Sequence, residues 1–173
     1  MSILIRKETT VIIQGITGRE AVNLTREGLD YGTRIVGGVT PGRAGRDVYG
    51  VPVYDCVRDI TSQMTVDGSI VTVPPRFTRD AVFEAIEAGV KLIVIVTERI
   101  PRAEVAQMVE LAGLRGARII GPNCLGILSP EDQRLAIETA QAASFVPNVT
   151  DVIPSVLEPA RRVEVERDVF ETL

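Results

Sequence analysis

The chain has 173 residues with a net charge of −4; 45% of the residues are hydrophobic and 4% aromatic, and none is histidine. This composition supports one folded domain and excludes a basic nucleic-acid-binding protein, histidine-ligated metals and phosphohistidine chemistry within this sequence. The cysteines, Cys56 and Cys124, match no zinc spacing, and no apolar run approaches the ~20 residues of a membrane span, so we expect a cytoplasmic protein without a membrane partner.

The first predicted strand ends in a turn with two glycines. The sequence TTVIIQGITGREA predicts a buried strand over 9–15, a turn containing Gly15 and Gly18, and a helix over 18–31. Glycine allows a ligand to approach the backbone, and a helix N-terminus offers free N–H groups to an anion. We therefore interpret the turn as a phosphate-binding element; the alternative is a tight packing corner.

A second strand is predicted over 34–41, and the loop after it carries Arg43 and Arg46. NAD-binding folds usually place a carboxylate at this point, but the first one here is Asp47. An arginine fork suits a ribose phosphate, which favours NADP or the 3′-phosphate of coenzyme A over NAD. The alternative for both arginines is a solvated surface position.

Strands and helices continue to alternate along the chain to residue 124. The predicted elements are a short strand over 51–55, strands over 68–75, 91–98 and 117–124, and helices over 55–64, 78–88 and 101–113. This alternation is typical of an α/β fold, a Rossmann-like doubly wound parallel sheet. Ligands bind at the carboxyl ends of such strands, so we expect one cleft lined by residues 15–18, 40–43, 74–77, 97–98 and 122–124.

The last part of the chain has a different pattern. Residues 129–173 contain several prolines and a charged final segment, with no second glycine-rich turn. We predict a domain over 1–128 and a short C-terminal extension over 129–173, helical or partly extended, that packs on the sheet edge or on a partner.

Several segments resemble a known family. YGTRIVGGVTPGRAG, VPPRFTRDAVFEAIEAGVKLIVIVTERIP and RIIGPNCLGILSP are similar to the amino-terminal domain of succinyl-CoA synthetase alpha subunits, and the similarity runs from residue 1 to about 130. The resemblance implies a Rossmann-like, CoA-binding domain. It also implies that the turn after the first strand holds the CoA phosphates, and that Arg43 contacts the nucleotide end.

The resemblance assigns further residues to the ligand. It implies that the strand end at 96–98 lines the CoA site, that the segment from Pro74 to Phe77 flanks the adenine or pantetheine path, and that Asn123 and Cys124 lie toward the thiol. The predicted cofactor-binding set is Gly15, Thr17, Gly18, Arg19, Glu20, Arg43, Pro74, Val96, Thr97, Glu98, Asn123 and Cys124. No catalytic residue is predicted; Cys124 is either a nucleophile or a small buried residue, and Glu98 either caps a helix or contacts the ligand.

The sequence also departs from the family pattern. Arg19, Glu20 and Ala21 replace small or amide residues and a glycine, Arg99 replaces a glycine, and Leu125 replaces a proline. The family's second domain carries a phosphorylated histidine, which is missing here, so the resemblance implies a truncated alpha subunit that cannot perform the ligase reaction alone.

The sequence is compatible with three functions. The first is a CoA or acyl-CoA binding protein without ligase activity of its own. The second is a subunit of an ADP- or GDP-forming acyl-CoA ligase, with the phosphohistidine and ATP-grasp domains on another chain, such as a beta-type subunit; a homodimer is a further possibility for the assembly. The third is an NADP-dependent reductase on a similar scaffold.

Overall fold

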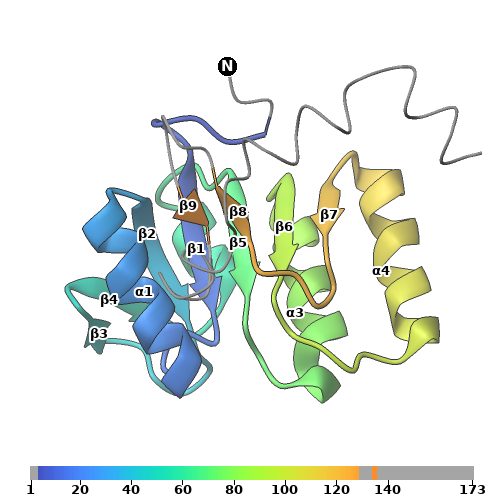
Figure 1. Cartoon of the computed structure of the whole chain (residues 1–173), viewed down its shortest axis with the longest axis horizontal. Helices are drawn as coiled ribbons and strands as arrows, with labels where there is room; N and C mark the ends of the chain where they lie inside the picture. The colour runs from blue at the N-terminus through green and yellow to red at the C-terminus, as the bar shows by residue number, and fades with distance from the viewer. Residues whose placement is uncertain (1–3, 129–133, 136–173) are drawn as a thin grey trace, which may run out of the picture. The chain divides into compact units, whose positions relative to one another are not determined.

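The structure, a computed structural model, describes residues 4–128 and 134–135 and contains a seven-stranded sheet with helices on both faces (Figure 1). The strand order is β3-β4-β2-β1-β5-β6-β7, and only β3, paired with β4, is antiparallel. The strands are β1 (Thr10–Gln14), β2 (Arg34–Val39), β3 (Asp47–Val48), β4 (Val51–Tyr54), β5 (Gly68–Val71), β6 (Leu92–Ile95) and β7 (Arg118–Ile120). The helices are α1 (Arg19–Tyr31), α2 (Val57–Thr61), α3 (Pro75–Glu87) and α4 (Arg102–Arg115), and β8 (Ile127–Leu128) pairs with β9 (Arg134–Leu135).

The central strands are buried on both faces because successive side chains point to opposite sides of the sheet. In β1, Ile12 belongs to the core cluster that includes residues of α2, α3 and α4, whereas Val11 and Ile13 belong to the cluster that includes residues of α1. The β-branched residues of β6 divide between the same two clusters. The continuous Val and Ile runs therefore predicted a sheet covered on both sides, and this prediction is confirmed.

The strand order reverses between β1 and β5, since the chain runs outward through β2 and β4 on one side and through β6 and β7 on the other. Such a switch point opens a crevice at the carboxyl ends of the two strands. The Rossmann-like fold class is confirmed, and the structure adds the short strand β3, which the sequence pattern did not indicate.

Two helices differ from their predicted bounds by three residues at one end: α2 ends at Thr61 rather than at 64, and α3 starts earlier than predicted. The sequence pattern placed the third helix at 78–88, but α3 begins at Pro75 with Pro74 as its N-cap. Proline suits the first turn of a helix because its missing N–H would have no intrahelical partner there. Thr78 is buried inside the helix, and its hydroxyl lies 3.3 Å from the Pro74 carbonyl.

The predicted extension over 129–173 lies outside the described residues, apart from the short strand β9. The boundary at 128 and the character of the extension stay predictions. Within the described part of the chain, no helix has the length and apolar character to cross a membrane. The cytoplasmic location also stays a prediction.

Candidate functional site

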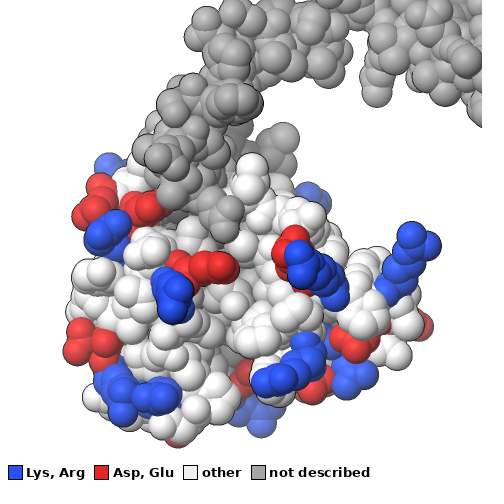
Figure 2. Space-filling model, turned by 60° about the horizontal axis from the view of Figure 1, so that its bottom comes forward, with Lys and Arg blue, Asp and Glu red and all other residues white. Residues whose placement is uncertain are grey.

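Two cavities lie along the carboxyl edge of the sheet. The switch-point cavity, about 1070 Å³, is lined by the ends of β1, β2 and β5, by the first turn of α1 and by one face of α3. The β6–β7 cavity, about 610 Å³, is lined by the loops after β5, β6 and β7. Figure 2 turns this end of the molecule forward and shows charged side chains of both signs around a largely uncharged centre. The two cavities adjoin, since Glu20, Thr72, Val73 and Pro74 line both of them.

The turn after β1 brings backbone close to the switch-point cavity. Gly15 has a φ of +88°, and a Cβ there would lie 3.1 Å from the Thr72 hydroxyl oxygen, so glycine is required. The N–H of Gly18 donates to the Gly15 carbonyl at 2.9 Å, which closes the turn. Gly18 is the N-cap of α1 and provides no side-chain cap, so the N–H groups of the first helical turn are available to an anion.

The turn is tied to the end of the neighbouring strand. The Thr17 hydroxyl lies 3.2 Å from the Thr40 hydroxyl, which in turn donates to the Val39 carbonyl. Thr17 and Thr40 both line the switch-point cavity. The loops after β1 and β2 therefore form one wall of the switch-point cavity together.

Arg43 lies beside this wall but does not line either cavity. Its backbone N–H, and that of Ala44, donate to the Asp55 carboxylate at 3.1 Å, which fixes the loop after β2. The Arg43 residue itself is exposed. All of the other residues in the predicted binding set line one cavity or the other, so Arg43 is the one that the structure does not place there.

One face of α3 lines the switch-point cavity with Phe77, which lies in the expected cleft segment 74–77, and with three residues that the sequence analysis missed, Asp80, Ala81 and Glu84. Their spacing of three, one and three places them on one side of a helix, but this signal was lost because the helix was predicted to begin at Thr78. The Phe77 ring is 49% exposed and lies under the Arg76 guanidinium, 4.7 Å from it.

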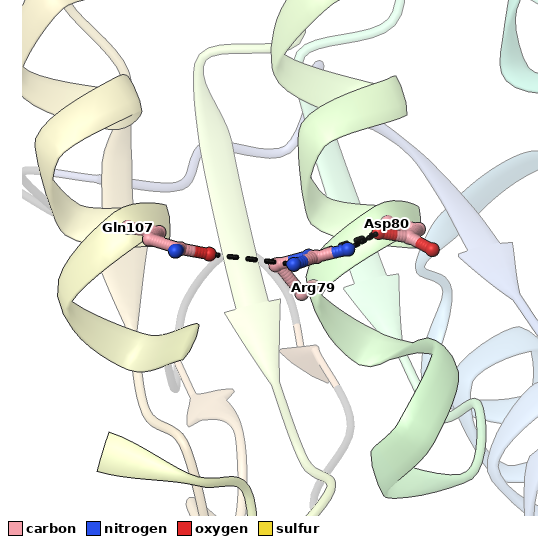
Figure 3. Close-up of polar contacts among 3 residues, drawn as sticks. All are labelled: Arg79, Asp80 and Gln107. Carbon is pink, nitrogen blue, oxygen red and sulfur yellow. Dashed lines mark hydrogen bonds and ion pairs between the residues drawn. The ribbon is translucent and has the colours of Figure 1, made fainter. Parts of the chain in front are cut away.

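The Asp80 carboxylate has a cationic neighbour. Arg79 pairs with Asp80 at 2.8 Å and reaches the Gln107 side chain on α4 at 3.5 Å (Figure 3). The hydrogen bond and charge of Asp80 raise the pKa of the Arg79 guanidinium. Arg79 thus offsets one negative charge at the rim of the switch-point cavity, and the contact joins α3 to α4.

A buried amide supports the floor of the switch-point cavity. Gln14 is 1% exposed; its Oε1 accepts a hydrogen bond from Ser69 at 2.8 Å and its Nε2 donates to the Ala81 carbonyl at 2.8 Å. Gln14 Nε2 also approaches the Glu84 carboxylate at 3.4 Å, and that carboxylate accepts the Val57 N–H at 2.8 Å. Every polar group of Gln14 is therefore satisfied, as burial requires.

The loops that line the β6–β7 cavity are joined by hydrogen bonds. The Thr97 hydroxyl donates to the Val73 carbonyl at 2.7 Å, and the Asn123 N–H donates to the Thr97 carbonyl at 3.0 Å. Glu98 pairs with Arg99 at 3.3 Å, and the N-cap of α4 is Pro101. Capping of α4 by Glu98, one of the two roles considered, is therefore not seen.

Cys124 has the environment of a packed thiol. Its Sγ donates to the Ile95 carbonyl at 3.2 Å, the residue is half-buried, and burial raises the pKa of the thiol. A nucleophilic cysteine needs a lowered pKa. Of the two roles considered, this geometry favours the small buried residue.

Comparison with protein families and relatives points to one ligand class. The model of the CoA binding domain family matches residues 6–99. The chain is 45% identical over 141 residues to succinate–CoA ligase [ADP-forming] subunit alpha 2 of Archaeoglobus fulgidus, covering 82% of this chain and 49% of that relative. It is 44% identical over 129 residues to the ADP-forming sulfoacetate-CoA ligase subunit SauD of Bilophila wadsworthia, covering 75% and 44%. The chain thus spans about half the length of these relatives.

Solved structures share the fold. ATP citrate lyase from Methanothrix soehngenii, in complex with citrate and coenzyme A, matches with a TM-score of 0.70 and 18% identity, over 78% of this chain and 24% of that chain. PH0766 from Pyrococcus horikoshii matches with a TM-score of 0.61 and 29% identity, over 70% and 29%. The citrate lyase match supports the fold alone.

Proposed function

The chain belongs to the CoA-binding domain family, and we propose that the groove formed by the switch-point and β6–β7 cavities is its coenzyme A site. Coenzyme A is the ligand that the family implies, and the groove suits it chemically. An uncapped helix N-terminus lies at one end, an exposed aromatic ring and a proline line the walls, and the groove continues past Pro74.

The single observation that carries this proposal is the turn at Gly15–Gly18. It brings backbone and free helical N–H groups to the topological switch point, where anionic nucleotides bind in this fold class. We place the pyrophosphate there, the nucleotide end toward the loop of Arg43, and the pantetheine arm along Thr97 and Asn123.

Titration calorimetry with coenzyme A tests the proposal. Wild-type protein should bind coenzyme A, and Gly18→Ala should weaken binding, because a methyl group at the N-cap stands between the anion and the helix and lies 3.2 Å from the Gly15 carbonyl. Gly113→Ala is the matched control, since a Cβ there meets nothing within 4 Å. NADPH binding without coenzyme A binding would favour the reductase instead and contradict the proposal.

The relatives' names favour a second function, as a CoA-holding component of an ADP-forming acyl-CoA ligase. The sequence has no histidine, so a phosphohistidine would have to come from a segment or subunit outside this sequence. The chain alone should form no ADP from ATP, coenzyme A and succinate, and ADP formation should need the added partner.

A further inference from the structure

We propose that Glu84 is a positioning residue for the nucleotide end of the ligand, acting through the loop that carries Arg43. The inference rests on the proposed coenzyme A site and adds to it a residue that acts without touching the phosphate. It is carried by hydrogen bonds that connect the floor of the switch-point cavity, the start of α2 and the loop after β2.

The Glu84 side chain joins α3 to the start of α2. Its Oε1 accepts the Val57 N–H at 2.8 Å, and its Oε2 lies 3.4 Å from Nε2 of Gln14. Val57 is fully buried and is the first residue of α2, so its N–H has no partner within the helix. Because the N-cap residue, Cys56, makes no side-chain cap, Glu84 provides the acceptor that the start of α2 needs.

Gln14 fixes this carboxylate relative to the sheet. Ser69 donates to Oε1 of Gln14 at 2.8 Å, which turns Nε2 toward α3, where it donates to the Ala81 carbonyl at 2.8 Å. The amide is buried, so its orientation cannot change without leaving one of these polar groups unpaired. Glu84 is therefore held on the β1 side by an amide of fixed orientation and in turn holds α2.

The start of α2 is connected to the loop of Arg43 through Asp55, which lies two residues before Val57. Oδ1 of Asp55 accepts the N–H groups of Arg43 and Ala44, both at 3.1 Å. Asp55 is exposed, so its place depends on the backbone that continues into Val57. The segment that Glu84 holds is thus the segment that holds the Arg43 loop.

The other contacts of this loop act elsewhere. The Arg43 N–H also lies 3.1 Å from the Thr40 carbonyl inside the loop, and Gly45 and Arg46 exchange backbone hydrogen bonds with Val53 of β4. These contacts shape the loop and hold its far end, whereas the bonds to Asp55 connect its middle to α2. Without an acceptor at residue 84, the buried Val57 N–H loses its partner, and the start of α2 moves to satisfy it. The guanidinium of Arg43 then loses its fixed base.

Titration calorimetry with coenzyme A and dephospho-coenzyme A tests this role, because only coenzyme A carries the 3′-phosphate. Glu84→Gln and Glu84→Met both remove the negative charge, but only glutamine keeps an oxygen that accepts the Val57 N–H. The wild type should prefer coenzyme A about fivefold; Glu84→Gln should retain most of this preference, and Glu84→Met should reduce it to about twofold or less. Glu87→Met, three residues further along α3 and outside both cavities, is the matched control and should leave it unchanged.

Asp55→Ala removes the same support from the other side. Because Asp55 is exposed, this variant should fold normally and lower the preference as Glu84→Met does. The double variant should lose no more of the preference than either single variant, since both act on one loop. Additive losses would contradict the shared route.

The two ligands also separate the two levels of the proposal. An unchanged preference in Glu84→Met, or an equal loss in Glu84→Gln and Glu84→Met, would overturn the role of Glu84 and leave the coenzyme A site standing. Equal affinity of the wild type for both ligands would do the same. Failure of the wild type to bind coenzyme A at all would overturn both.

Discussion

Arg43 lies on an exposed loop that two hydrogen bonds to Asp55 hold next to Thr40 and Pro41. The sequence predicted a guanidinium aimed at a ribose phosphate, but in the structure Arg43 lines neither cavity. A long side chain at this point can still reach a phosphate at the nucleotide end, in an exposed setting that weakens the interaction.

We expect Arg43→Gln to weaken coenzyme A by about 1 kcal/mol more than dephospho-coenzyme A, since only the former carries the 3′-phosphate. Calorimetry with both ligands measures the difference. Arg46→Gln is the control, because Arg46 follows in the same loop and also lines neither cavity. Equal losses for both ligands would show that Arg43 does not contact that phosphate.

Cys124 provides a pH-dependent prediction at the same scale. Burial raises the pKa of its thiol, so the folded protein holds this proton at pH values where the unfolded chain has begun to release it. The contribution of this thiol to the free energy of unfolding is fully present at pH values below the pKa of the unfolded chain. It is lost as the pH rises through the higher pKa of the folded protein. Alkylation by iodoacetamide at pH 8 should be slower at Cys124 than at a free thiol, and coenzyme A should slow it further. Fast alkylation at neutral pH would indicate an activated thiol instead.

At the scale of the element, α1 begins with a charge conflict. Glu20 lies in the first turn, where a carboxylate stabilises the helix by about 0.3–1 kcal/mol but repels a bound phosphate. Glu20→Gln should therefore lower the melting temperature slightly and raise the affinity for coenzyme A. Asp30→Asn, in the last turn of the same helix, should leave the affinity unchanged. A loss of affinity in Glu20→Gln would mean that the carboxylate contacts the ligand directly.

The start of helix α3 is a feature that could not be predicted from the sequence pattern. Its apolar spacing was recognised, but Pro74 and Pro75 were assigned to the end of a strand, because proline also ends strands. Only the fold shows that Pro75 starts a helix, and this start places Phe77, Asp80 and Glu84 on the cavity. The hydrogen bonds of Gln14 were equally invisible, since they join β1 to residues distant in sequence.

At the scale of the whole molecule, the parallel sheet was predictable from the alternating apolar runs, and the cavities at its carboxyl edge were predictable from the positions of the strand ends. The Gly15–Gly18 turn is local, so its sequence determines its shape. The division of the edge into two joined cavities depends on strand order, which residue patterns do not encode. The positive φ of Arg99 was also found only in the structure, because the residue type does not indicate a left-handed backbone conformation.

Amide hydrogen exchange of the full chain, with and without coenzyme A, tests the central claim most directly. Coenzyme A should slow exchange in the segments that carry the lining residues of the two cavities: 15–21, 72–77, 96–99 and 123–125. Residues 65–67 and 116–118 line a separate cavity and should be unaffected. Unchanged exchange along the groove at saturating coenzyme A, or protection confined to that separate cavity, would contradict the account.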